Sequence, residues 1–188
     1  MEPLAQHILD FWFGAPPLAA RDAWFRKDAA FDAAIADAFG SAVATALAGG
    51  YQAWDAEPRG ALARIVLLDQ FTRNIHRDTP RAFAGDALAL AAAQALVDAG
   101  ADTRLDAFER WFAYLPFEHA ESWPAQERSL ALFTRLRDDT GLAAPLEWAE
   151  KHAAVIRRFG RYPHRNAILG RTSTPEEVAF LAQPGSRF

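Results

Sequence analysis

The sequence lacks cysteine altogether, which excludes disulfide bonds, a thiol nucleophile and thiolate metal ligands. It also lacks a glycine-rich phosphate loop, a Gly-x-Ser-x-Gly elbow and a dinucleotide-binding fingerprint. Runs of β-branched residues are almost absent, so strands are not expected. No stretch approaches the roughly 18 consecutive apolar residues of a membrane span, and the acidic start is unlike a signal peptide. We therefore expect a cytoplasmic protein that has no membrane partner.

The apolar residues that are present recur mostly at helical spacing, and good helix formers (Ala, Leu, Arg and Glu) dominate the composition. The helical stretches are separated by short loops, without a linker. This pattern predicts a single all-α domain over residues 1–188, built from about eight or nine antiparallel helices. The spacing of helix pairs is loosely compatible with a tetratricopeptide-like superhelix.

Helix boundaries follow from caps, prolines and glycines. The stretch 60–71 is apolar almost all round, which predicts a central, buried helix. Pro116 is expected to end the helix that begins at Asp106. Thr174, Pro175 and Glu177 predict a capping box. The other predicted helices used below are residues 3–13, residues 28–48 with a break at 40–41, and residues 79–99.

Charge is distributed unevenly along the chain. The formal net charge is −4, yet residues 151–171 contain six Lys or Arg and no acid, which leaves a net charge of −10 on the remainder. Six cations so close together repel one another unless acids from elsewhere, or a ligand, offset them. The overall acidity, with a pI near 5.7, argues against nucleic acid as a partner.

A first polar segment extends directly from the buried helix. Asp69, Arg73 and Arg77 are spaced four residues apart and so share one helix face, with Gln70 and Asn74 beside them. A buried arginine must be paired or must hold an anion. An Asp69–Arg73 pair that ends the helix is one interpretation, and an anion site is the other.

A second polar segment, Glu118, His119 and Glu121, is expected to begin the element after Pro116. Acids near a helix N-terminus complement the helix dipole, which gives these residues a purely structural interpretation. The alternative is a functional group made of a carboxylate and an imidazole. The spacing does not match the Glu-x-x-His or His-Glu-x-x-His patterns of metal sites, so no metal is expected.

A third segment is the basic stretch after the left-handed turn expected at Gly160. Arg161, His164, Arg165 and Asn166 lie among apolar and aromatic residues, so they are less readily explained as solvated surface than Arg157 and Arg158. This segment leads into a helix N-terminus, which is itself a place where anions bind.

We therefore expect these segments to meet in one polar cleft inside a helical shell. In particular, the side chain of Arg73 or Asn74 should lie near that of His164 or Arg165. Arginine holds a carboxylate or phosphate through two hydrogen bonds. The predicted function is recognition of a small anionic ligand or a peptide carboxylate, without a cofactor, by Arg73, Asn74, Arg77, Arg161, His164, Arg165 and Asn166.

Two alternatives remain open at this point. In an enzyme, His119 or His164 would act as a general base, Glu118 would orient it, and an arginine would stabilise developing charge. In an interaction scaffold, the polar cluster would only lock helices together. A scaffold keeps its arginines internally paired and has no cavity. An enzyme needs a histidine in reach of both a carboxylate and open space.

Five motifs in this order resemble a known bacterial family, catalogued as domain of unknown function 924. The similarity covers nearly the whole chain and implies an all-α fold of the tetratricopeptide-like type. It implies no activity and no catalytic residues. The motifs are ILDFWFG, WFRKDAAFD, LLDQFTRNIHRDTPRAFAGDALAL, PFEHAES with QERSLALF, and RFGRYPHRNAILGRTSTPEEVAFL.

Overall fold

The computed structural model describes residues 1–186, and these residues form helices and turns but no strand. The prediction of an all-α chain is confirmed. A π-helical segment, Val66–Phe71, joins α3 to α4 without interrupting the helical path. The α-helices are α1 (Pro3–Phe13), α2 (Ala29–Leu47), α3 (Pro58–Ile65), α4 (Thr72–Ile75), α5 (Asp86–Asp98), α6 (Ala107–His119), α7 (Trp123–Thr140), α8 (Ala144–Phe159) and α9 (Pro175–Leu181).

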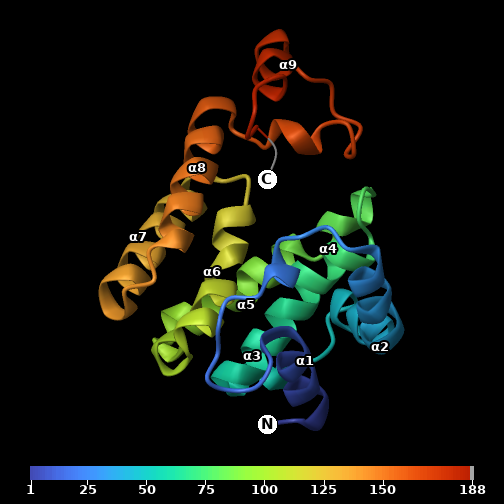
Figure 1. The fold of residues 1–188 in the computed structure, drawn as a ribbon, viewed down its shortest axis with the longest axis vertical. Coiled ribbons are helices and arrows are strands. Elements are labelled where there is room, and N and C mark those ends of the chain that lie inside the picture. Colours follow the sequence, from blue (N-terminus) through green and yellow to red (C-terminus); the bar gives the residue numbers. More distant parts are fainter. Residues whose placement is uncertain (187–188) are drawn as a thin grey trace.

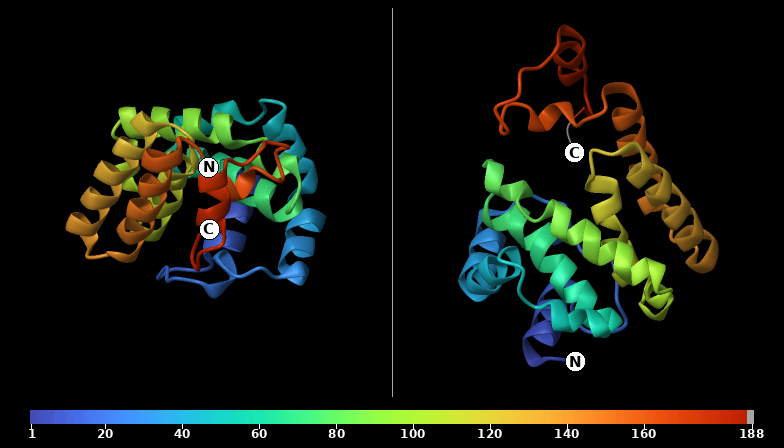
Figure 2. Two further views of the ribbon diagram at one scale, coloured as in Figure 1. Left: turned by 90° about the horizontal axis from the view of Figure 1, so that it is seen from above. Right: turned by 180° about the vertical axis from the view of Figure 1, so that it is seen from behind.

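From α5 to α8, helices that follow one another in the chain are neighbours in space (Figure 1). The rod formed by α3, the π-helical segment and α4 runs through the N-terminal part, where α3 packs against α1 and α5. On the other side, α7 packs against both α6 and α8. The chain after α8 turns away and places α9 at the far end from the N-terminus (Figure 2). This arrangement is compatible with a tetratricopeptide-like superhelix, which stays a prediction.

The core forms around the rod, as the all-round apolar run predicts. Every residue from Gly60 to Asp69 is buried. Phe71, at the end of the π-helical segment, contacts Trp12 of α1 and Phe39 of α2, with ring centroids 5.5 and 5.0 Å apart. Aromatic pairs of this kind contribute beyond the area they bury. The rod is therefore fixed in place from several sides.

The helix predicted over residues 79–99 is wrong in its first part. Pro80–Phe83 forms a 3-10 turn, and α5 begins at Asp86. Gly85 lies against the π-helical segment so closely that an added Cβ would meet the carbonyl oxygen of Leu68 at 2.1 Å. Only glycine allows this approach, so the chain bends here before α5 starts.

The helix break predicted at Pro116 is also wrong. Pro116 lies inside α6, which continues to His119. A proline removes one backbone hydrogen bond and strains the preceding turn, but the stretch Trp111–Glu118 is entirely buried, so tertiary packing compensates. Glu118 and His119 therefore belong to the last turn of α6, not to the start of the next element. Nor is there a break in α2 at Gly40.

Helix α2 is the one helix among the described residues that is long and apolar enough to cross a membrane by length and composition. Core helices of other proteins pass the same test. Here Ile35, Phe39 and Val43 face the core, while Asp32 forms an ion pair with Arg77 at 2.7 Å. Burial of a charge in lipid is costly, so these contacts favour packing within the protein.

Candidate functional site

The site begins with a buried carboxylate on the π-helical segment. The wider turn of a π-helix leaves backbone groups without their usual partners, and such segments are frequent at functional sites. Two side chains satisfy carbonyls here: Thr72 Oγ1 donates to Leu67 O at 2.9 Å, and Arg73 Nη1 donates to Asp69 O at 2.8 Å. The side chain of Asp69 is almost fully buried. The segment thus holds an acid inside the core.

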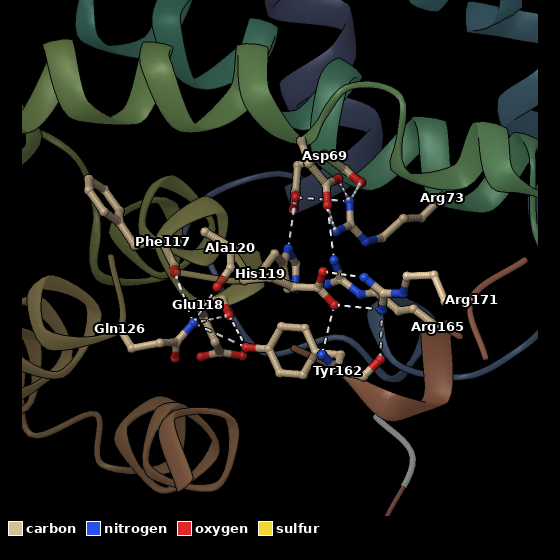
Figure 3. A network of polar contacts seen from close by, with 12 residues as sticks. Asp69, Arg73, Phe117, Glu118, His119, Ala120, Gln126, Tyr162, Arg165 and Arg171 are labelled. Atoms are coloured by element: carbon tan, nitrogen blue, oxygen red, sulfur yellow. Dashed lines mark hydrogen bonds and ion pairs between the residues drawn. The ribbon is translucent and has the colours of Figure 1, made fainter. Parts of the chain in front are cut away.

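The Oδ1 of Asp69 has two partners (Figure 3), and Gln70 Nε2 donates to its Oδ2. Its Oδ1 lies 2.7 Å from Nδ1 of His119 and 3.0 Å from Nη1 of Arg73. Burial alone would raise the pKa of Asp69. The charge of Arg73 and the hydrogen bond with His119 outweigh burial and hold this pKa well below its usual range. Asp69 is therefore ionised at neutral pH.

His119 is neutral at pH 7. Burial and the charge of Arg73 lower the pKa of His119, and Asp69 raises it. The lowering effects prevail, so this pKa lies below the ordinary value of an imidazole. A neutral imidazole carries one proton, and the ionised Asp69 accepts only, so Nδ1 must be the donor. Nε2 is then left as a base. The structure therefore contains an oriented carboxylate–imidazole pair.

The end of α6 that carries His119 is fixed by two buried side chains. Gln126 Nε2 donates to the carbonyl oxygens of Glu118 and Ala120, at 2.8 and 2.9 Å. The hydroxyl of Tyr162 also donates to the carbonyl of Glu118, and Tyr162 N donates to Glu121 Oε1 at 2.7 Å. A helix end leaves carbonyls that need such partners. The basic C-terminal stretch therefore supports the site from below (Figure 3).

Arg165 lies close to Arg73, as expected, because both side chains contact Asp86. Its guanidinium lies between the rings of Phe83 and Tyr162, 4.7 and 4.6 Å from their centroids. It also contacts Asp86 at 3.3 Å, and Asp86 contacts Arg73 at 3.0 Å. The predicted proximity of Arg73 and Arg165 is thus present. His164 lies next to Tyr162, with ring centroids 5.6 Å apart.

Arg161 and Asn166 lie in a different cluster, around Glu177 of α9. Arg161 donates two hydrogen bonds to the Glu177 carboxylate, at 2.7 and 2.8 Å, and Asn166 donates one at 3.3 Å. These hydrogen bonds, those from Arg161 above all, lower the pKa of Glu177 to about 2. Glu121 likewise binds Arg171 through two hydrogen bonds. Acids from outside the basic stretch therefore offset its cations.

A cleft of about 490 Å³ opens beside the Asp69–His119 pair. Its polar lining comes from the turn before α2, from the π-helical segment, from α4 and the turn after it, from the end of α6, and from α8. Its aromatic lining comes from the turn before α2 and from α6 and α8. The lining residues are Trp24, Phe25, Arg26, Gln70, Arg73, Asn74, Arg77, Trp111, Leu115, Glu118, His119, Trp148 and His152.

The cleft contains one part of the predicted site and not the other. Arg73, Asn74, Arg77 and the catalytic candidates Glu118 and His119 line it. The remaining predicted residues lie outside its lining and are Arg161, His164, Arg165 and Asn166. Among the described residues, no group of three His, Asp or Glu side chains is arranged to hold a metal ion.

Sequence reasoning did not find Trp148 and His152, which both line the cleft. His152 Nδ1 lies 2.9 Å from Trp148 O and 3.1 Å from Glu118 Oε1. Burial lowers the pKa of His152 to about 3 and raises that of Glu118 to about 8. Both shifts indicate a neutral pair and not an ion pair. The one signal in the sequence was the four-residue spacing of Trp148 and His152, which is equally typical of core packing.

Fold and site together define an all-helical protein with an open cleft that joins an aromatic lining to an oriented carboxylate–imidazole pair. The chain belongs to a family of bacterial proteins of unknown function, DUF924, whose model matches residues 8–185. A solved structure of a protein of unknown function from Agrobacterium tumefaciens, ATU0120, is similar, with a TM-score of 0.86 and 41% identity over 95% of this chain and 97% of that one. The comparison with curated proteins gives no match.

The contacts of Arg165 predict a structural role that stability measurements can check. Its side chain is 7% exposed and touches Asp86, so Arg165→Ala removes a buried partner and the packing of two rings. Because Asp86 keeps Arg73, we expect a loss of about 3 kcal/mol, the lower end for a broken buried pair. Denaturant unfolding in phosphate-free buffer measures this loss.

Arg158→Ala is the matched control, because Arg158 binds Glu176 with 48% of its side chain exposed. This change should alter stability by less than about 0.5 kcal/mol. If Arg165→Ala changed the free energy of unfolding as little as Arg158→Ala, the structural role of Arg165 would be refuted. Arg165 would then be a cation available to bind a ligand.

Proposed function

We propose that the cleft binds a small organic anion that also carries an apolar or aromatic group; the C-terminal carboxylate of a peptide is a larger form of the same ligand. One observation carries this proposal. The lining combines three guanidinium groups with four large aromatic side chains, and its one acid, Glu118, is neutral at pH 7. Such a surface attracts an anion and offers apolar area beside it.

Arg73, Asn74 and Arg77 are suited to hold the anionic end. Arg77 is held by Asp32 through two hydrogen bonds of 2.7 and 2.9 Å, and Asn74 donates to the same carboxylate at 2.7 Å. Acids behind the cleft therefore fix the polar groups before a ligand arrives. Side chains fixed in this way lose little conformational entropy on binding.

The aromatic residues are suited to hold the apolar end. Phe25 is 62% exposed and Trp148 is 47% exposed, which is unusual for side chains of this size. Phe25 stacks on Trp111 with a centroid distance of 5.2 Å. Trp111 precedes His119 by two turns on α6, or about 12 Å along the helix. A ligand with its ring near Trp111 or Trp148 can place its anionic group near His119.

A scaffold without a ligand is the weaker interpretation, because an open cleft lies over the polar cluster. Nucleic acid is disfavoured because acids such as Glu121, Glu176 and Glu177 neutralise the basic stretch. We also propose a cytoplasmic location for the protein. A small metabolite or a peptide end in that compartment fits the size of the cleft.

A second candidate function is catalysis, and the Asp69–His119 pair favours it. An imidazole that is neutral, oriented by a carboxylate and placed in the wall of a cleft has the features of a general base. In an ester hydrolysis, His119 would take a proton from water as the water oxygen attacks the acyl carbon, and an arginine would stabilise the negative charge on the acyl oxygen. The bond to the alcohol oxygen would then break, and the imidazolium would return the proton to the departing alcohol.

Binding is tested with a series of ω-phenylalkanoates, from phenylacetate to 6-phenylhexanoate, followed by tryptophan fluorescence at pH 7. We expect one chain length to bind best, and its amide to bind at least tenfold more weakly because a charge pair is lost. Trp148→Ala should weaken binding by about tenfold, or roughly 1.4 kcal/mol.

Trp123→Ala is the control for the loss of an indole, because Trp123 lies on α7 under Arg157 and does not line the cleft. It should leave affinity unchanged. Equal affinity for the acids and their amides, or equal effects of the two tryptophan variants, would contradict anion binding in this cleft.

Catalysis is tested with p-nitrophenyl esters of the same acids. If His119 is the general base, His119→Ala should lower the rate at pH 7 by at least about a hundredfold, while His76→Ala, which changes a histidine outside the cleft, should not. Ester cleavage that survives His119→Ala would rule out His119 as the base.

A further inference from the structure

A second pocket, of about 480 Å³, lies near the start of the chain and shares no lining residue with the cleft. It is formed by the residues before α1, by the turn between α2 and α3, and by the start of α3. Its side chains include two aromatic rings and two acids, but no Lys, Arg or His. The charge of these side chains favours a cation, whereas that of the cleft favours an anion. The lining residues are Met1, Glu2, Tyr51, Ala53, Trp54, Glu57 and Gly60.

Tyr51 and Trp54 bring a stacked pair of rings to this pocket. Their ring centroids lie 4.1 Å apart and their planes differ by 20°. Both residues are only partly buried, and both line the pocket. Stacking covers one face of each ring and leaves the rest of the ring for other contacts. The face of an aromatic ring is electron-rich and attracts cations, so this pair supplies an apolar surface that suits an organic cation.

The turn that carries the two rings is fixed on α3. The carbonyl oxygen of Trp54 lies so close to Gly60 that an added Cβ would meet it at 2.3 Å. From α3, Arg64 Nε donates to Asp55 Oδ1 in the same turn at 2.8 Å. Tyr51 has a φ of 64°, in the left-handed region that favours glycine, and yet this position holds a ring that lines the pocket. The rings are therefore held in place before a ligand arrives.

Glu2 and Glu57 are the acids of this pocket, and both are exposed to solvent. The two arginines of α3 are bound by other acids, Arg59 by Glu109 and Arg64 by Asp55. Within the part of the chain that the structure describes, neither Glu2 nor Glu57 forms an ion pair. Their side chains also make no capping hydrogen bond to the helices that follow them. Their negative charge is therefore available to a ligand.

We propose that this pocket binds a small molecule that carries a quaternary ammonium group. Such a group has no N–H to donate, so it is bound by aromatic rings and by the field of nearby carboxylates. The lining offers both. A primary ammonium group is strongly hydrated and needs several acceptors at hydrogen-bond distance to replace its water. The two exposed acids of this pocket do not supply such a set. The inference is independent of the anion proposed for the cleft.

The experiment compares three probes of similar size at pH 7. Choline carries the quaternary ammonium group, 3,3-dimethylbutan-1-ol is its uncharged isostere, and ethanolamine carries a primary ammonium group. Binding is followed through the backbone amide signals of Ala53 and Gly60 in nitrogen-15 spectra, because both residues line the pocket. Choline should bind about tenfold more tightly than either of the other probes. Trp54→Ala should weaken the binding of choline by about tenfold, because it removes one of the two rings.

A double variant, Glu2→Gln with Glu57→Gln, tests the charge without a change of shape. Both acids are exposed and neither caps a helix through its side chain, so the fold should be unaffected. The affinity for choline should fall by about tenfold, and that for 3,3-dimethylbutan-1-ol should stay the same. Trp123→Ala and Glu127→Gln are the matched controls, because both residues lie on α7 and outside the pocket. Both controls should bind choline as wild type does.

Three results would overturn the proposal. The first is that choline shifts neither the Ala53 nor the Gly60 signal. The second is that choline binds no more tightly than 3,3-dimethylbutan-1-ol or ethanolamine, because a quaternary ammonium group would then not be what the pocket recognises. The third is that the double glutamine variant binds choline as tightly as wild type does. None of these results depends on whether the cleft binds an anion.

Discussion

The buried carboxylate of Asp69 is the constraint on which the rest of the site depends. An ionised acid inside a core is stable only with partners of good geometry. Arg73 and His119 are those partners, at 3.0 and 2.7 Å. Meeting this requirement brings the start of α4 and the end of α6 together. It also fixes the tautomer of His119 and draws Arg73 toward Asp86.

The C-terminal segment completes this arrangement. Tyr162 caps the end of α6, while Arg165 lies against Phe83 and reaches Asp86. Four of the six cations of residues 151–171 form ion pairs with acids on other elements, and these pairs connect the helices: Arg158, Arg161, Arg165 and Arg171. The cleft beside the Asp69–His119 pair is lined mainly by guanidinium groups, neutral histidines and aromatic rings. Its chemistry is therefore a consequence of how the buried acid is stabilised.

Much of the fold could be predicted because its signals are local. The buried stretch 60–71, the start of α2 near residue 28 and the capping box of α9 follow from spacing and from residue types. The predictions at Pro116 and over residues 79–99 failed because tertiary contacts decided the outcome. Packing keeps α6 intact through a proline, and Gly85 bends the chain where the π-helical segment approaches. Neither contact is visible in the residues nearby in sequence.

The site was predictable only in part, for the same reason. That Arg73 and Arg165 would meet could be inferred from polar groups placed in apolar surroundings. The hydrogen bonds of Arg161 and Asn166 to Glu177 could not be inferred, since they depend on where α9 packs and not on the residues nearby in sequence. The role of Asp69 as the orienting acid for His119 depends on a π-helical turn that carries no clear sequence signal. The neutral pair of Glu118 and His152 depends on α6 and α8 being neighbours.

The account depends on His119 being a neutral imidazole whose Nδ1–H donates a hydrogen bond to Asp69. A long-range nitrogen–proton correlation spectrum of histidine-labelled protein at pH 7 measures this directly. For His119 it should show a protonated Nδ1 and an Nε2 with the shift of a bare imidazole nitrogen. Two protonated nitrogens, or a proton on Nε2 alone, would contradict the account.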